Sequence, residues 1–168
     1  GVSVMNLAYD SPLIAEGTDM FYGAAGIGMA SLFFWRKLGE QHFLDNACQA
    51  GDRILAAAQT NESGYYWTNA DGGLYYGYAH GAAGISLFLL YLYLGTRESK
   101  YLQYAVAGMD YEIAQGTVKD DYIVWNRSSS DNLLSPYWRY GNAGTGSALI
   151  RFYAALKEDR YKELAEKA

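Results

Sequence analysis

Apolar residues gather in three long stretches, and each is followed by a stretch with one apolar and one polar face. The first kind is apolar nearly all round, which is typical of a helix packed on several sides. These stretches are residues 29–38, 87–94 and 148–156. The second kind is amphipathic, as in the stripe formed by Phe43, Ala47, Ala50 and Ile54. The pattern predicts a buried helix, a short turn and an outer helix, three times in succession.

Each buried stretch opens on the same small-residue segment. The segments are YGAAGIG at 22–28, HGAAGIS at 80–86 and YGNAGTG at 140–146. Their leading glycines, Gly23, Gly81 and Gly141, are 58 and then 60 positions apart, and Phe43, Tyr101 and Tyr161 repeat that spacing at the heads of the outer helices. A fixed period of this length indicates stacked helical units that bury one continuous core.

The repeat predicts an all-α fold, an α/α toroid (barrel) of helical hairpins. We expect residues 1–168 to form part of a single domain, with units at about 19–60, 77–116 and 137–168. Three hairpins are too few for a closed ring, so an incomplete ring is expected. Between the units, alternating aromatics and glycines at 61–76 favour a small β-hairpin, whereas the link 116–136 includes a polar loop, SSSDN at 128–132.

The glycines suggest where a site would form. Lacking Cβ, they allow close helix contacts and unusual backbone angles at the turn, and they leave backbone N–H groups accessible at the helix starts. If the buried helices run in the same direction, their starts converge at one end of the core. That end is where we expect chemistry.

Three residues near these turns occur in one unit only. One position before the glycine the units have Tyr22, His80 and Tyr140, so the histidine is unique; Asp19 and Arg139 are unique at their own positions. Each also has a purely structural interpretation, as a turn cap, a hydrogen-bonded core histidine and a surface arginine. Their matching placement favours a shared site.

The same segments resemble the motifs of a known family, the lanthionine synthetase C-like (LanC-like) cyclases. AHGAAGI at 79–85 is similar to the family's histidine motif, DMFYG at 19–23 to its aspartate motif, and WRYG at 138–141 to its Trp-Cys-Tyr-Gly motif. The resemblance implies an α/α toroid. It also implies an enzyme that adds a cysteine thiol of a precursor peptide to a dehydroalanine or dehydrobutyrine residue.

The resemblance further implies roles for single residues. His80 and Asp19 would serve proton transfer. The family's zinc-ligand cysteine is replaced by Arg139, which has no lone pair for a metal, and a later Cys-His pair would fall past Ala168. We therefore expect no zinc, as in the cyclase domains of kinase-fused synthetases, and a fused or partner kinase or lyase domain is a possible companion. Arg139 would stabilise the thiolate or the enolate.

Aromatic residues are abundant, with 17 tyrosines and four tryptophans. We expect the peptide to be bound by Tyr22, Tyr76, Trp138 and Tyr140. Further rim candidates are Tyr65, Tyr66, Trp67, Tyr75 and Trp125. Packing between helices and loops is the alternative for all of them.

Composition narrows the other possibilities. A net charge of −5 argues against nucleic acid or an anionic membrane as partner, and no apolar run reaches the roughly 18 residues of a membrane span. A cytoplasmic setting is expected, with Cys48 as a core thiol and His42 facing solvent. Two alternatives stay open: a non-catalytic peptide-binding scaffold, and a carbohydrate-active toroid that draws a second acid from Asp71, Glu16 or Asp10.

Overall fold

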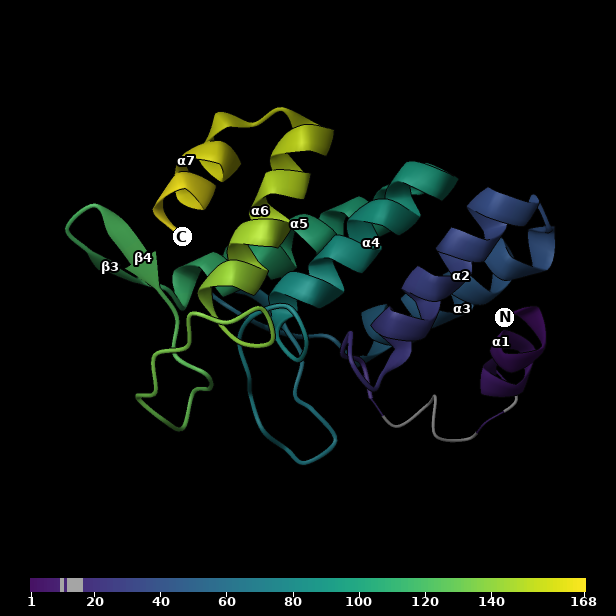
Figure 1. Ribbon diagram of the computed structural model, residues 1–168, viewed down its shortest axis with the longest axis horizontal. Helices are drawn as coiled ribbons and strands as arrows, with labels where there is room; N and C mark the ends of the chain where they lie inside the picture. The colour runs from purple at the N-terminus through teal and green to yellow at the C-terminus, as the bar shows by residue number, and fades with distance from the viewer. Residues whose placement is uncertain (10, 12–16) are drawn as a thin grey trace.

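The computed structural model describes residues 1–9, 11 and 17–168, so Asp10 and Glu16 lie outside the described residues. Within that part of the chain there are seven helices and four short strands (Figure 1). The helices are α1 (Val2–Tyr9), α2 (Ala24–Leu38), α3 (Gln41–Ala57), α4 (Ala82–Thr96), α5 (Ser99–Ala114), α6 (Asn142–Leu156) and α7 (Asp159–Lys167). The strands are β1 (Gln59–Asn61), β2 (Gly64–Tyr66), β3 (Thr117–Lys119) and β4 (Tyr122–Val124).

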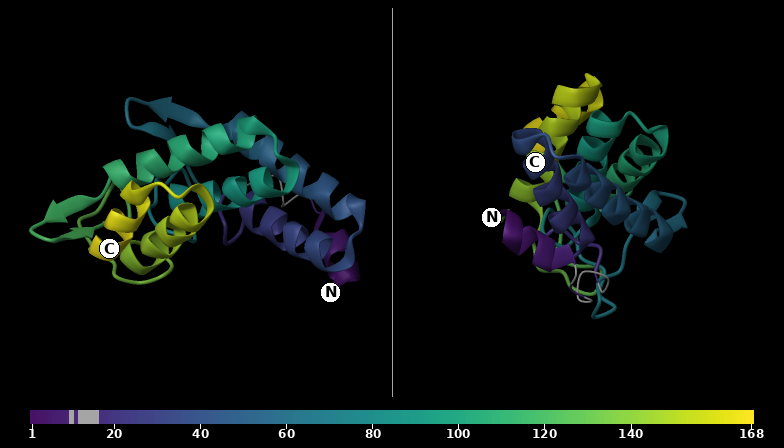
Figure 2. Two further views of the ribbon diagram at one scale, coloured as in Figure 1. Left: turned by 90° about the horizontal axis from the view of Figure 1, so that it is seen from above. Right: turned by 90° about the vertical axis from the view of Figure 1, so that its right-hand side faces the viewer.

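The three predicted helical hairpins are present as α2–α3, α4–α5 and α6–α7. They stand side by side along an arc, and α2, α4 and α6 all begin at the same end, where the loops gather (Figure 1). Seen from above, α3 and α5 lie on one side of the array and α2 and α4 on the other (Figure 2). The prediction of an all-α, toroid-like and incomplete ring is confirmed.

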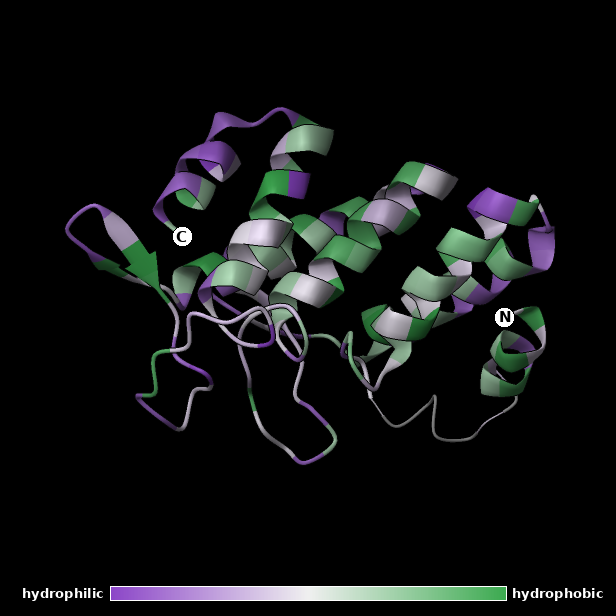
Figure 3. Ribbon diagram, in the orientation of Figure 1, coloured by the Kyte–Doolittle hydropathy of each residue, from purple (hydrophilic) through white to green (hydrophobic). Residues whose placement is uncertain are grey.

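The middle inner helix, α4, is the most deeply buried element. It contacts α2 on one side, α6 on the other and α5 along its length, and ten of its residues are buried. This explains why its sequence is apolar all round. The outer helix α7, by contrast, is mostly hydrophilic (Figure 3).

The repeat extends to the junctions between inner and outer helices. Each inner helix ends on a residue in the left-handed conformation, Gly39 (φ 75°), Arg97 (φ 64°) or Lys157 (φ 61°). The next residue is a glutamate in every unit, and it precedes the first turn of the outer helix, where a negative charge is favourable. A left-handed cap therefore closes each inner helix even where the residue is not glycine.

Two β-hairpins follow the first two outer helices. The hairpin expected within 61–76 is present, but it begins earlier: β2 lies in that segment, whereas β1 lies before it except for Asn61. β3 and β4 form an equivalent hairpin 58 positions later, within the link 116–136, and this second hairpin was not predicted. Helix α1 was not predicted either. Both hairpins belong to the repeat, and the first packs along α5, where Tyr65 stacks on Tyr104.

Two buried tryptophans anchor these hairpins to the helices. The indole N–H of Trp67 donates to the backbone oxygen of Ile54 (2.8 Å), and that of Trp125 donates to the oxygen of Glu112 (2.7 Å). Both rings are almost wholly buried. The structure therefore places them in the core and not at the rim, where the sequence suggested that they could hold a peptide.

The outer helices are joined by a repeated polar contact. Asp52 of α3 accepts hydrogen bonds from Lys100 (2.7 Å) and from the hydroxyl of Tyr101 (2.9 Å) of α5. One unit later Asp110 accepts a hydrogen bond from Arg160 (2.6 Å), but there the hydroxyl of Tyr161 accepts from Arg160 and does not donate to the carboxylate. His42, at the position of Lys100, is exposed as predicted and lies 3.6 Å from Glu40.

In the part of the chain that the structure describes, no helix combines the length and the apolar character needed to cross a bilayer.

Candidate functional site

Backbone hydrogen bonds hold the three turns side by side. The amide of Phe21 donates to the oxygen of Ala79 (3.1 Å), and the amide of Ala79 donates to the oxygen of Arg139 (3.1 Å). All three residues stand two positions before a leading glycine. The repeat therefore aligns each turn with the next, and side chains near these positions meet.

The glycines near these turns matter mainly because there is no room for a side chain. A Cβ on Gly84 would overlap the backbone oxygen of Tyr78 in the preceding turn, and the turn could not pack so closely. Of the three leading glycines, only Gly141 has a positive φ (73°). Gly23 and Gly81 have ordinary negative φ values, so the expected unusual backbone angle is found in one unit of three.

Asp19 is buried and fully engaged. Its Oδ1 accepts the amides of Phe21 (3.0 Å), Tyr22 (2.7 Å) and Gly23 (3.0 Å). Its Oδ2 lies 2.7 Å from Nδ1 of His80. Burial acts to raise the pKa of this carboxyl, but the bonds from His80 and the amides outweigh it and hold the pKa below its usual value. Asp19 thus caps its own turn and also orients the histidine.

His80 is the centre of a three-residue chain. On its other side, Nε of Arg139 donates to Nε2 at 3.1 Å. Arginine has only donors, so Nε2 must be the acceptor, and the ring proton then lies on Nδ1, pointing at Asp19. The structure brings together the three residues that the sequence singled out, in the order carboxylate, imidazole, guanidinium.

Aromatic rings surround the imidazole. Tyr140 stacks on it at 5.4 Å between ring centroids, and Phe21, Tyr22 and Tyr75 lie at 5.5, 5.7 and 6.0 Å. Only 6% of His80 remains exposed. The cage restricts rotation of the ring and leaves its Nε2 edge facing the guanidinium.

A cleft of about 500 Å³ opens over these residues. Its lining includes Asp19, Tyr22, His80, Arg139 and Tyr140. This volume is within the range of small-molecule and cofactor pockets. It would also admit one or two residues of a peptide at the histidine.

The far wall of the cleft comes from the loop after the first hairpin. Asn69 donates to the backbone oxygen of His80 (3.0 Å). Asp71 accepts the amide of Gly73 and the hydroxyl of Tyr75, both at 2.8 Å. The hydrogen bond from the amide of Gly73, together with that from the hydroxyl of Tyr75, lowers the pKa of Asp71. Sequence reasoning missed Asn69 and placed Tyr75 only among rim aromatics. The polar run NADGG at 69–73, a few residues before the histidine motif, was the available signal.

The four residues expected to bind substrate are found in different places. Tyr22 is 71% exposed, and it lines the cleft together with Tyr140. Trp138 is half exposed and packs on Tyr78 at 4.8 Å, outside the cleft lining. Tyr76 lies in the core, where burial raises its pKa, and its hydroxyl faces Gln115.

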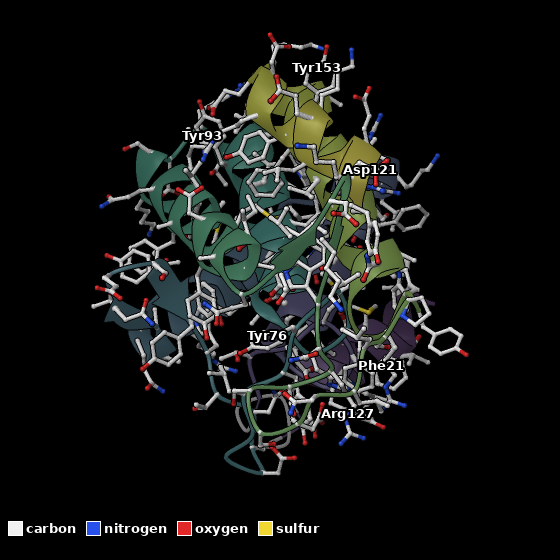
Figure 4. All side chains as sticks on the ribbon, turned by 90° about the vertical axis from the view of Figure 1, so that its left-hand side faces the viewer. Phe21, Tyr76, Tyr93, Asp121, Arg127 and Tyr153 are labelled. Atoms are coloured by element: carbon white, nitrogen blue, oxygen red, sulfur yellow. The ribbon has the colours of Figure 1, made fainter. Side chains whose placement is uncertain are left out.

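Figure 4 shows Tyr76 between the loops and the helices, with Phe21 and Arg127 nearer the loop end. The position of Tyr76 therefore does not suit direct contact with a substrate.

A buried carboxyl supports the middle turn from behind. Glu112 of α5 accepts the amide of Gly77 (2.6 Å) and the hydroxyl of Thr145 (3.1 Å) through Oε1. Its Oε2 is buried and has no hydrogen bond of normal geometry within the described residues. Burial raises the pKa of Glu112 to about 7, although the hydrogen bonds act in the opposite direction. Glu112 links α5, the turn that carries His80 and the start of α6.

The described residues do not fit the zinc of the family pattern. Arg139 stands at the cysteine position, and a guanidinium cannot ligate a cation. No three His, Cys, Asp or Glu side chains of the described residues come together as a metal site. What this arrangement can supply is an oriented imidazole, a fixed cation and aromatic walls.

Comparisons with known proteins agree with this picture. A family model described as "Lanthionine synthetase C-like protein" matches residues 5–168. Among curated proteins, none matches the chain. Among solved structures, a glycoside hydrolase of family 76 (mannosidase) from Bacteroides thetaiotaomicron is similar, with a TM-score of 0.56 and 19% identity.

That similarity covers 85% of this chain and 41% of the mannosidase, so the chain spans less than half of that enzyme. At this identity the likeness concerns the fold alone.

Proposed function

Because the chain belongs to the lanthionine synthetase C-like family, we propose that its cleft binds a dehydrated precursor peptide and adds a cysteine thiol to a dehydroamino acid. The observation that carries this proposal is the chain of contacts Asp19–His80–Arg139 at the cleft. It joins a base, the group that orients it and a cation. These are the parts that an addition through an enolate requires.

In the proposed reaction His80 is the base and then the acid. A cysteine thiol has a pKa of about 8.5 and is mostly protonated at neutral pH. Nε2 of His80 takes its proton as the sulfur bonds to the β-carbon of the dehydro residue. The electron pair of the double bond moves to the carbonyl, giving an enolate. The imidazolium then returns the proton to the α-carbon, and the thioether is complete.

Asp19 and Arg139 stabilise charged species of the proposed reaction. Asp19 orients the imidazole and stabilises its charged form, as carboxylates do in other histidine sites. Both oxygens of Asp19 are occupied, so a direct proton relay to the substrate is the less suitable role. The guanidinium of Arg139 would stabilise the thiolate and the enolate. In this scheme no step depends on a metal.

The peptide would reach the histidine across exposed aromatic rings. Phe21, Tyr22 and Tyr137 are at least half exposed near the turns. A kinase or lyase activity, fused or separate, would have to supply the dehydro residue, because it must form before the addition.

The decisive test is a set of His80 variants assayed with a dehydrated, cysteine-containing peptide. Asn at position 80 can still donate to Asp19 but has no equivalent of Nε2. We expect His80→Asn to lower the rate of free-thiol loss by about a hundred- to ten-thousand-fold. His42→Asn is the matched control, since His42 is the other histidine and is exposed. Melting curves of both variants establish that the fold is kept.

Unchanged cyclisation in a folded His80→Asn variant would exclude the scheme. If the wild-type protein retains the peptide and leaves its thiol intact, the chain is a peptide-binding scaffold.

A carbohydrate-active enzyme is the second candidate. Asp71 lines the same cleft as Asp19, so two carboxylates face one cavity. Asp19, however, is occupied by its amides and His80, whereas paired-acid hydrolysis needs one carboxyl to give up a proton. Release of sugar from a mannoside, lost in Asp71→Asn, would favour this reading over the cyclase.

A further inference from the structure

In the part of the chain that the structure describes, the guanidinium of Arg139 is held by aromatic rings and an imidazole. Within the described residues it makes no ion pair, whereas Arg127 and Arg160 each pair with a carboxylate at 2.6–2.8 Å. Its charged group lies 5.1 Å from the ring centre of Phe21 and 5.3 Å from that of Tyr140. Such contacts position a cation but do not neutralise it.

The single polar side-chain contact of Arg139 in the described residues has a chemical consequence. Its Nε–H points at the Nε2 lone pair of His80, 3.1 Å away. The proposed reaction needs that lone pair to take the thiol proton. In the observed arrangement the base is therefore masked by the neighbouring cation.

Two carboxylates of the same cleft could compete for Arg139, and both are committed elsewhere. Asp19 is held by three amides and by His80. Asp71 is held by Gly73 and Tyr75. An anion that enters the cleft would thus meet an uncompensated guanidinium.

We propose that Arg139 is a binding site for the anionic sulfur of the substrate, and that the guanidinium passes from Nε2 of His80 to the sulfur as the thiol proton passes to Nε2. The bond from the guanidinium to the neutral imidazole has one charged partner, whereas a bond to an anion has two of opposite sign, so an anion outcompetes the imidazole for the guanidinium. Binding and activation are then one event. Naming the anion as a cysteine thiolate rests on the proposed cyclase function.

The first test measures how accessible Nε2 is. Diethyl pyrocarbonate acylates an unprotonated imidazole nitrogen, and the sequence has two histidines, so exposed His42 is an internal reference. We expect His80 to react about tenfold faster in Arg139→Met than in wild type, from the loss of one charged hydrogen bond. Arg127→Met, which removes a guanidinium paired with Asp131, is the matched control and leaves the rate unchanged.

Equal His80 rates in wild type and Arg139→Met would overturn the proposal. Arg139→Lys keeps the charge and a donor, so it should restore part of the protection. If burial alone protected His80 from the reagent, Arg139→Lys and Arg139→Met would give the same rate.

The second test asks whether a thiolate displaces the guanidinium. Wild-type protein is titrated with N-acetylcysteine methylamide above the thiol pKa, and the ¹⁵N signal of His80 Nε2 is followed. We expect this signal to move with the thiol and not with the serine analogue, and Arg139→Met to show no response. A response that is equal in both proteins, or absent in wild type, would contradict the proposal.

Neither readout requires turnover. A wild-type protein that passes both tests and does not cyclise would leave the anion site standing and remove the cyclase proposal. A wild-type protein that cyclises the peptide, although its His80 reacts as fast as in Arg139→Met, would leave the cyclase proposal standing and remove the anion site.

Discussion

The outer layer of the molecule, formed by the outer helices and the β-hairpins, differs from the turn region before the inner helices in what the repeat preserves. In the outer layer, equivalent positions keep equivalent contacts, as in the indole bonds of Trp67 and Trp125. In the turn region the backbone contacts repeat, but the side chains that they align are Asp19, His80 and Arg139. Shared residues hold the units together, and residues found once meet where the units meet.

The middle turn differs from its neighbours because it is flanked on both sides. His80 is 6% exposed, whereas Tyr22, at the equivalent position of the first unit, is 71% exposed. Position within the array therefore decides which copy of a repeated site has the buried environment that favours chemistry.

The largest expected effect tests the outer layer. Trp67→Ala and Trp125→Ala should each lower the free energy of unfolding by about 3–5 kcal/mol, because each leaves a cavity and removes an indole hydrogen bond to a helix carbonyl. Urea unfolding measures this loss. If the comparison holds, the two equivalent variants give similar values, and a loss for only one of them would show that the repeat is not energetically equivalent.

The second-largest effect is expected for Glu112, which lies on an outer helix and not in the turn region. Glu112 is found once, with Ile54 at its equivalent position, yet its contacts are structural. Its pKa is raised from 4.5 to about 7 in the folded protein. The folded state therefore holds this proton more tightly. Its contribution to stability is complete below about pH 4.5 and is lost as the pH rises through about 7.

Glu112→Gln should remove this pH dependence. At about 1.4 kcal/mol per pKa unit, wild type should lose up to about 3 kcal/mol from this group between pH 4.5 and 8, relative to the variant. Urea unfolding across that range measures the difference. Exposed Glu166→Gln is the control, and equal pH profiles for wild type and Glu112→Gln would argue against a buried titration.

The smallest effect should come from the polar contacts between outer helices. Asp52→Asn and Asp110→Asn remove exposed pairs with Lys100 and Arg160, and each should cost less than about 1 kcal/mol. Unfolding in 1 M salt should reduce the loss, since these charges are screened. A loss in Asp52→Asn that salt does not change would indicate that the hydroxyl of Tyr101 contributes more than the charges.

Much of this arrangement was predictable from the printed residues. The period of the glycine segments located all three hairpins, and a search for residues that break the repeat found Asp19, His80 and Arg139. The second β-hairpin could have been found by carrying the first one forward 58 positions. Glu112 could not, because one acid in an amphipathic helix is usually solvated and nothing local shows what it faces.

The sequence by itself determined the helical units, their order and the turn positions, because periodicity and glycine spacing are local properties that survive in any arrangement of the chain. Tertiary structure alone decided which atoms meet. It placed Tyr76 in the core and Asn69 beside the histidine, and it directed Arg139 to Nε2 of His80. The physical reason is that side-chain direction at a turn depends on how the next turn packs against it, and that packing joins residues about sixty positions apart.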